Sequence, residues 1–195
     1  MTHPHPSSFY PELTDERLAV IAEQLLDIRF NTIREMDSHY DDTYTRETAV
    51  FGRSRNMLID MCLSAQYDWL SLASPAMDVT FRIGQVPCRF FRDDHELPEK
   101  VGFFKRNAVD TLFALDESQP VMWRFVVEKA LTEEDEDQVF FIGYNVFQEK
   151  VSQWTYSSAS QVLYSIDSFT PDTKEIPPAK VEIREDAGNE EAQNE

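Results

Sequence analysis

The sequence predicts an α+β fold, in which an N-terminal helical hairpin packs with an antiparallel sheet of four to five strands. Two observations predict it. Apolar residues recur every three to four positions up to Leu72, and at every second position after Pro75. Helices that precede strands, without alternating with them, are typical of α+β domains.

The length of 195 residues is typical of one domain. Prolines and acidic residues without periodicity predict a disordered acidic tail at the C-terminus. We therefore expect a flexible N-terminus over residues 1–13, a single domain over 14–170 and the tail over 171–195. Within the domain, we expect the helical hairpin over 14–73 and mainly β structure over 76–168.

The hairpin is predicted from helix signals. Thr14 is a good N-cap, and Asp15 and Glu16 follow in the first turn, where the helix dipole favours acidic residues. The apolar stripe of this first helix continues to Tyr40. A second stripe predicts a helix over Arg46–Leu72, which Pro75 closes.

The sheet is predicted from alternation. The expected strands are Met77–Ile83, Val86–Phe91, Val121–Leu131 and Gln138–Phe147, followed by a strand or short helix over Val151–Tyr164. A short helix is expected over Phe103–Leu115, and Pro87 favours an edge position for its strand.

Two adjacent aromatic pairs lie in the expected strands. Phe90-Phe91 and Phe140-Phe141 must each place one ring on each face of the sheet, because side chains alternate along a strand. Both faces are therefore expected to be covered. A second copy of the chain could cover one of them, so a homodimer is an open possibility.

The charge balance limits the partners. The chain has 36 acidic and 18 basic residues, a net charge of -18, and most of the excess lies before the tail. Such a surface repels nucleic acids and anionic membranes and attracts basic proteins. It also keeps a protein soluble, and solubility alone is the simplest alternative explanation.

Acidic residues cluster at three places that could contact a basic partner. We expect the first group at the tip of a hairpin, and the other two in loops or at a helix end. The candidate partner-binding residues are Glu133, Glu134, Asp135, Glu136 and Asp137, then Asp93 and Asp94, then Asp41 and Asp42.

Three strand arginines support a different possibility. If Arg82, Arg89 and Arg124 share one face of the sheet, they could bind an anionic ligand such as a phosphate or carboxylate. Pairing with acidic residues such as Asp78 and Glu128 is the simpler alternative.

Other chemical signals are weak. The chain has no phosphate-binding, dinucleotide-binding, nucleophile-elbow or zinc-protease motif, so we expect no cofactor and favour a non-enzymatic protein. Asp93, Asp94, His95 and Glu96 could ligate a metal, but neighbouring side chains in an extended chain point apart, so we expect no metal site. Cys62 and Cys88 are expected to be buried free thiols.

These patterns favour an acidic, non-enzymatic interaction protein of the cytoplasm that binds and occludes a basic partner. A nucleic-acid-binding protein is the most plausible partner, by analogy with DNA-mimicking inhibitors of phages, mobile elements and immunity systems. The alternative is a small-molecule-binding domain or enzyme that uses the three arginines. A third possibility is a structural dimer or adaptor whose helices carry the interface.

Overall fold

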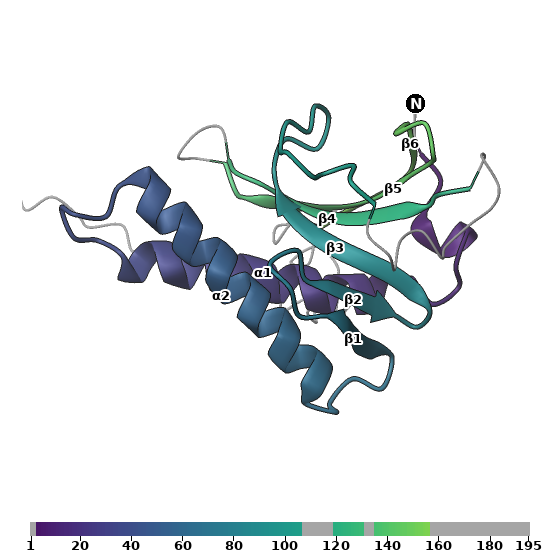
Figure 1. Ribbon diagram of the computed structural model, residues 1–195, viewed down its shortest axis with the longest axis horizontal. Helices are drawn as coiled ribbons and strands as arrows, with labels where there is room; N and C mark the ends of the chain where they lie inside the picture. Colours follow the sequence, from purple (N-terminus) through teal and green to yellow (C-terminus); the bar gives the residue numbers. More distant parts are fainter. Residues whose placement is uncertain (1–2, 107–118, 131–134, 157–195) are drawn as a thin grey trace, which may run out of the picture. The chain divides into compact units, whose positions relative to one another are not determined.

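Over the part of the chain that the structure describes, two α-helices form a hairpin and six strands form one sheet, so the predicted α+β class is confirmed (Figure 1). The computed structural model describes residues 3–106, 119–130 and 135–156. The expected tail and the greater part of the expected helix over Phe103–Leu115 lie outside these residues. The elements are a 3₁₀ helix η1 (Pro6–Ser8), helices α1 (Asp15–Glu35) and α2 (Thr43–Leu63), and strands β1 (Leu70–Ser74), β2 (Thr80–Ile83), β3 (Val86–Arg92), β4 (Met122–Glu128), β5 (Gln138–Tyr144) and β6 (Lys150–Tyr156).

Capping residues set the helix starts. The side chain of Thr14 accepts a hydrogen bond from the Arg17 backbone N–H at 3.5 Å, which confirms the predicted N-cap of α1. α1 ends at Glu35, before the expected Tyr40. α2 begins three residues earlier than expected, because Asp42 accepts from the Thr45 backbone N–H at 2.7 Å and caps it.

The predicted extension of α2 to Leu72 is wrong. The helix ends at Leu63, and Ala65 adopts a positive φ of 54°, which turns the chain out of the helix. Residues 70–74 then form β1, the edge strand that pairs with β2. The apolar residues of this segment had continued the helical stripe; in β1, Leu70 is buried and Leu72 and Ala73 are half-buried.

The sheet has more strands than the four to five expected, and one pair is parallel. The strand order is β1-β2-β3-β4-β5-β6, and β3 and β4 run parallel while all other neighbours are antiparallel. The long connection from β3 to β4 allows this crossover. Pro87 is accommodated in an interior strand because the pairing of β3 with β4 starts only at Cys88.

Different parts of the chain pack on the two faces of the sheet. α1 and α2 pack on one face, where Phe90 and Phe141 belong to the larger hydrophobic core. On the other face, Phe91 and Phe140 pack in a smaller cluster with Phe103. This arrangement confirms the predicted split of both aromatic pairs.

The N-terminal segment, which was expected to be flexible, packs against the domain. Leu13 is fully buried. The Ser152 hydroxyl of β6 donates a hydrogen bond to the Pro4 carbonyl at 2.8 Å. The expectation of flexibility rested on composition, which does not report these packing contacts.

Candidate functional site

Three adjoining grooves line one region of the domain around the end of β4 and the start of β5. They have volumes of about 310, 260 and 430 Å³. The first and second share Glu128 and Lys129, and the second and third share Asp135 and Glu136. The shared residues show that the three grooves are neighbours.

Carboxylates dominate these grooves. Seven acidic residues line them against three basic ones, Arg92, Lys100 and Lys129. We call the acidic set the acidic track: Asp27, Asp93, Asp94, Glu128, Asp135, Glu136 and Asp137. The structure thus brings together two of the three acidic groups singled out in the sequence. Glu133 and Glu134 lie outside the described residues.

Sequence reasoning missed Asp27 and Glu128. Asp27 lies on the exposed side of α1, and Glu128 is the last residue of β4. Neither stands in an acidic run, and only the packing of α1 beside the segment before β5 brings Asp27 to the track. The polar side of the predicted first helix and the end of the predicted strand are the only sequence signals that could have found them.

The third groove also has an apolar side. Leu26 and Phe30 of α1 line it opposite Asp135 and Glu136, and Phe30 is 65% exposed. The guanidinium of Arg34 lies 5.5 Å from the centre of the Phe30 ring. This end of the track therefore offers an exposed aromatic ring beside exposed carboxylates, and a cation already lies over that ring.

Asp137 differs from its neighbours, because it is bound inside the protein. It lies 2.6 Å from Arg29 Nε and accepts a hydrogen bond from the Ala130 backbone N–H at 2.8 Å. Arg29 is 1% exposed. Asp137 was predicted to contact a partner, but the structure uses its charge to neutralise a buried arginine.

An interior ion cluster surrounds Arg29 and consists of Arg29, Glu47, Arg92 and Asp137. Glu47 of α2 lies 3.0 Å from Arg29 Nη1 and 2.9 Å from Arg92 Nε. Burial works against the charge of Arg29, but its hydrogen bonds to Glu47 and Asp137 raise its pKa. The cluster ties α1, α2, β3 and the segment before β5 together.

Asp93 and Asp94 organise the loop after β3. Asp93 accepts hydrogen bonds from the backbone N–H groups of Glu99 and Lys100, at 3.1 and 2.9 Å. Asp94 accepts from those of Leu97 and Glu96, and these bonds lower the pKa of its carboxyl group. Both residues line the track and also hold the loop in a tight turn.

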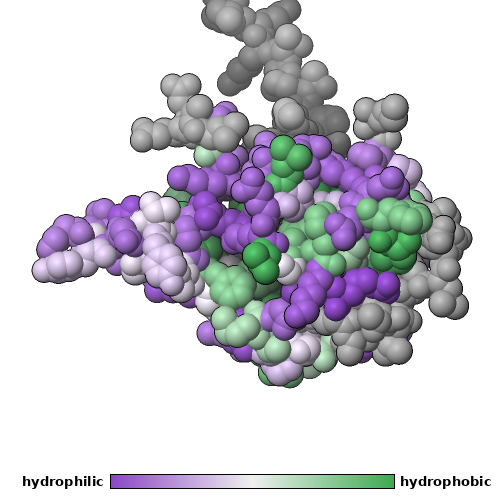
Figure 2. Space-filling view, turned by 45° about the horizontal axis from the view of Figure 1, so that its top comes forward, coloured by the Kyte–Doolittle hydropathy of each residue, from purple (hydrophilic) through white to green (hydrophobic). Residues whose placement is uncertain are grey.

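Asp41 and Asp42 do not belong to the lining of the three grooves. They lie in the turn between α1 and α2, which extends past the sheet in Figure 1. Figure 2 shows this end of the helical hairpin coloured as hydrophilic. Asp42 caps α2, and Asp41 accepts from the Ser38 backbone N–H at 3.0 Å. Asp42 therefore stabilises the start of α2, and Asp41 stabilises the turn between the two helices.

One face of the sheet carries the three strand arginines, which is the condition that the anion-binding hypothesis required. Arg89 is directly opposite Arg124, and Arg82 is opposite Pro87, two residues from Arg89. Arg124 is fully buried and donates to the Phe103 carbonyl at 3.2 Å, and Arg89 donates to the Lys105 carbonyl at 2.9 Å. These bonds support a structural role, and the anion pocket stays a prediction.

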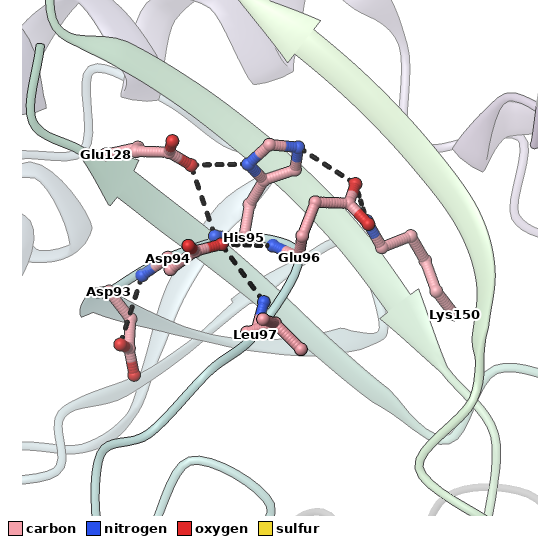
Figure 3. A network of polar contacts seen from close by, with 7 residues as sticks. All are labelled: Asp93, Asp94, His95, Glu96, Leu97, Glu128 and Lys150. Atoms are coloured by element: carbon pink, nitrogen blue, oxygen red, sulfur yellow. Dashed lines mark hydrogen bonds and ion pairs between the residues drawn. The ribbon is translucent and has the colours of Figure 1, made fainter. Parts of the chain in front are cut away.

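The loop after β3 also carries a histidine network (Figure 3). Nδ1 of His95 forms an ion pair with Glu128 of β4, and its Nε2 lies 3.0 Å from Glu96. Lys150 Nζ lies 2.6 Å from the same Glu96 oxygen. The imidazole ring stacks on Phe140, with ring centres 3.6 Å apart.

This network contains a set of groups that could hold a metal ion. Asp94, His95 and Glu128 each offer one ligand atom, and these atoms lie within 4.8 Å of one another. The sequence had predicted no metal site, because the side chains of the 93–96 run were expected to point apart. The turn after Asp93 and the neighbouring strand β4 bring a third ligand, Glu128, to Asp94 and His95.

The cysteines are free, as predicted. Cys88 is buried and Cys62 is half-buried. Burial raises the pKa of the Cys62 thiol to about 11. A thiol with such a pKa is a poor nucleophile at neutral pH, which argues against a catalytic cysteine here.

Comparisons with known proteins add no functional information. No family model matches the chain, and no curated protein or solved structure is significantly similar to it. Among the described residues, the structure contains no helix with the length and apolar character of a membrane span.

Proposed function

We propose that this chain is a non-enzymatic binding protein whose acidic track engages and occludes a basic protein surface. One observation carries the proposal: three neighbouring grooves gather seven carboxylates, one of them the Arg29-bound Asp137, and the third groove is also lined by the exposed aromatic side chain of Phe30. Acidic residues kept only for solubility have no need to gather in grooves with an apolar end.

The charge of the track supports a cationic partner. Asp27, Asp135 and Glu136 are exposed and line the third groove. The buried Arg29 pairs with Asp137 and Glu47, and Arg34 lies over the Phe30 ring at the apolar side of the groove. A positive surface approaching this groove gains electrostatic attraction, which steers association and weakens as salt rises.

The exposed Phe30 ring at one end of the acidic track favours a partner that binds through arginine. A guanidinium pairs with carboxylates through two parallel hydrogen bonds and also stacks on aromatic rings, whereas an ammonium group is a compact point charge. The contact of Arg34 with Phe30 is an example of such stacking within the chain, and a partner arginine would have to displace Arg34 or stack on the opposite side of the ring. We expect the partner segment to combine arginine with apolar residues.

Nucleic-acid-binding proteins are the class of partner we propose, because their phosphate-binding arginines and lysines also fit carboxylates. Binding would block the nucleic-acid site by occupying it. The proposal keeps the expected cytoplasmic location and requires no cofactor, membrane or homodimer.

Selection from a displayed library of random peptides tests the proposal without knowledge of the partner. The wild-type protein is the bait, and the variant D27N/D135N/E136Q is used for counter-selection. A matched control, D37N/D60N/D68N, removes three exposed carboxylates from outside the track, so both variants have the same net charge.

We expect enrichment of peptides that contain arginine and apolar residues. By fluorescence anisotropy, such peptides should bind the control like wild type, bind the track variant at least tenfold more weakly, and lose affinity in raised salt. Enrichment of neutral or acidic peptides would refute the proposal, and so would an equal loss of affinity in both variants.

A further inference from the structure

The loop after β3 and the end of β4 together supply three side chains of the types that bind transition-metal ions. Asp94, His95 and Glu128 come from two separate chain segments, and their potential ligand atoms all lie within 4.8 Å of one another. We propose that Asp94, His95 and Glu128 form a binding site for a divalent transition-metal ion such as Zn²⁺.

The ligand types suit such an ion. Zinc is bound by imidazole nitrogen and carboxylate oxygen at about 2.0–2.2 Å, and a site with three protein ligands keeps one position for water. Two carboxylates balance the charge of a divalent cation. Mg²⁺ and Ca²⁺ prefer oxygen ligands alone, so the imidazole favours a transition metal over them.

The surroundings of His95 hold its ring in the orientation that a metal ligand needs. Nε2 lies 3.0 Å from Glu96 Oε1, and Lys150 Nζ fixes the same oxygen at 2.6 Å (Figure 3). The ring lies flat on Phe140, at an angle of 2°. A histidine ligand commonly donates its second ring N–H to a carboxylate in this way, which leaves Nδ1 for the metal.

The site is accessible and can close around an ion. Asp94 is exposed, and the side chains of His95 and Glu128 are 18% and 28% exposed. Ligand atoms around a tetrahedral zinc ion are roughly 3.4 Å apart, so closure needs movements of about 1 Å. The metal would replace the ion pair between Nδ1 and Glu128. Asp94 and Glu128 also belong to the acidic track, but the peptide selection tests Asp27, Asp135 and Glu136, so the two proposals can fail separately.

Zinc binding to the metal-free full chain tests the proposal. The protein is treated with a chelator and dialysed, and Zn²⁺ is then titrated in the calorimeter and in competition with a chromophoric chelator. Co²⁺ serves as a second probe, because its visible absorption reports coordination number and ligand type.

The variants are H95Q and E128Q at the site, E96Q beside it, and H3Q/H5Q and H39Q as controls for the other histidines. Circular dichroism and urea unfolding confirm that each variant is folded. If E128Q fails to fold, H95Q still tests the site.

We expect one Zn²⁺ to bind per chain, and bound Co²⁺ to show the visible absorption typical of a low coordination number. An excess of Mg²⁺ or Ca²⁺ should not compete with Zn²⁺ for the site. H95Q and E128Q should each weaken zinc binding at least tenfold, and E96Q less so. The histidine controls should bind like wild type. Absence of saturable binding, or equal binding by H95Q and wild type, would overturn the site, and neither result bears on the peptide selection.

Discussion

The interior ion cluster and the acidic track lie side by side and use carboxylates in opposite ways. Asp137 and Asp135 are two residues apart in one acidic run, yet Asp137 binds the buried Arg29 while Asp135 is exposed in two grooves. In the cluster, carboxylates stabilise the fold. In the track, Asp27, Asp135 and Glu136 are exposed to solvent and line the groove that contains Phe30. The difference shows that the position of a carboxylate in the fold decides its role, and that its place in an acidic run of the sequence does not.

The largest effect should come from Arg29→Ala. The substitution leaves Glu47 and Asp137 without their buried cation, and removing one partner of a buried pair costs about 3–5 kcal/mol of the free energy of unfolding. Urea unfolding followed by tryptophan fluorescence measures it. Arg34→Ala on the exposed side of the same helix should change the value by less than about 0.5 kcal/mol. Equal midpoints for the two variants would contradict the structural role of the cluster.

Asp137→Asn should have a smaller effect. The amide still accepts from the Ala130 backbone N–H, but it lacks the charge that Arg29 pairs with. We expect a loss of about 1–3 kcal/mol, typical of a buried hydrogen bond to a charged group. Selected peptides should bind this variant like wild type. A strong loss of peptide binding with unchanged stability would instead place Asp137 in the binding surface.

The track variant D27N/D135N/E136Q should show the opposite behaviour. Neutralising exposed carboxylates should leave the free energy of unfolding within about 0.5 kcal/mol of wild type, or raise it slightly by reducing self-repulsion. Thermal and urea unfolding check this at low and raised salt. A large loss of stability would show that the track carboxylates belong to the fold, as those of the cluster do.

The smallest effect concerns pH. Hydrogen bonds donated by Thr45 lower the pKa of Asp42, so its charged form stabilises the folded state. That contribution is present above the unfolded pKa near 4 and is lost as the pH falls through the lower, folded value. Asp42→Asn keeps the cap without the charge. Its stability should therefore fall less than that of wild type between pH 5 and pH 2, and parallel curves would contradict the assignment.

Much of the fold could be predicted because hydrophobic periodicity reports it directly. The change of period near Pro75 separated helices from strands, and Thr14 marked the start of α1. β1 was missed because residues 70–74 continue an apolar stripe of helical spacing, and only pairing with β2 decides between the two structures. The parallel pairing of β3 with β4 was missed because local pattern carries no information on which strands meet.

The candidate site could be predicted only in part. Runs of acidic residues identified Asp93, Asp94, Asp135 and Glu136, because charge density is visible in sequence. The same signal also included Asp137, and it could not show that Asp137 pairs with the buried Arg29, which is 108 positions away. Asp27 and Glu128 needed the packing of α1 and β4. Tertiary contacts thus decide which carboxylates line the grooves and which bind a buried arginine.

The most direct test of the acidic track is a titration of isotope-labelled protein with N-acetyl-arginine amide, followed by backbone amide chemical shifts. The lysine compound is the control for charge alone. We predict shifts that concentrate at Asp27, Phe30, Asp135 and Glu136, are larger for arginine than for lysine, and fade as salt rises. Shifts of equal size at exposed acidic residues outside the track, such as Asp60 and Asp68, would contradict a localised site and leave solubility as the function of the charge.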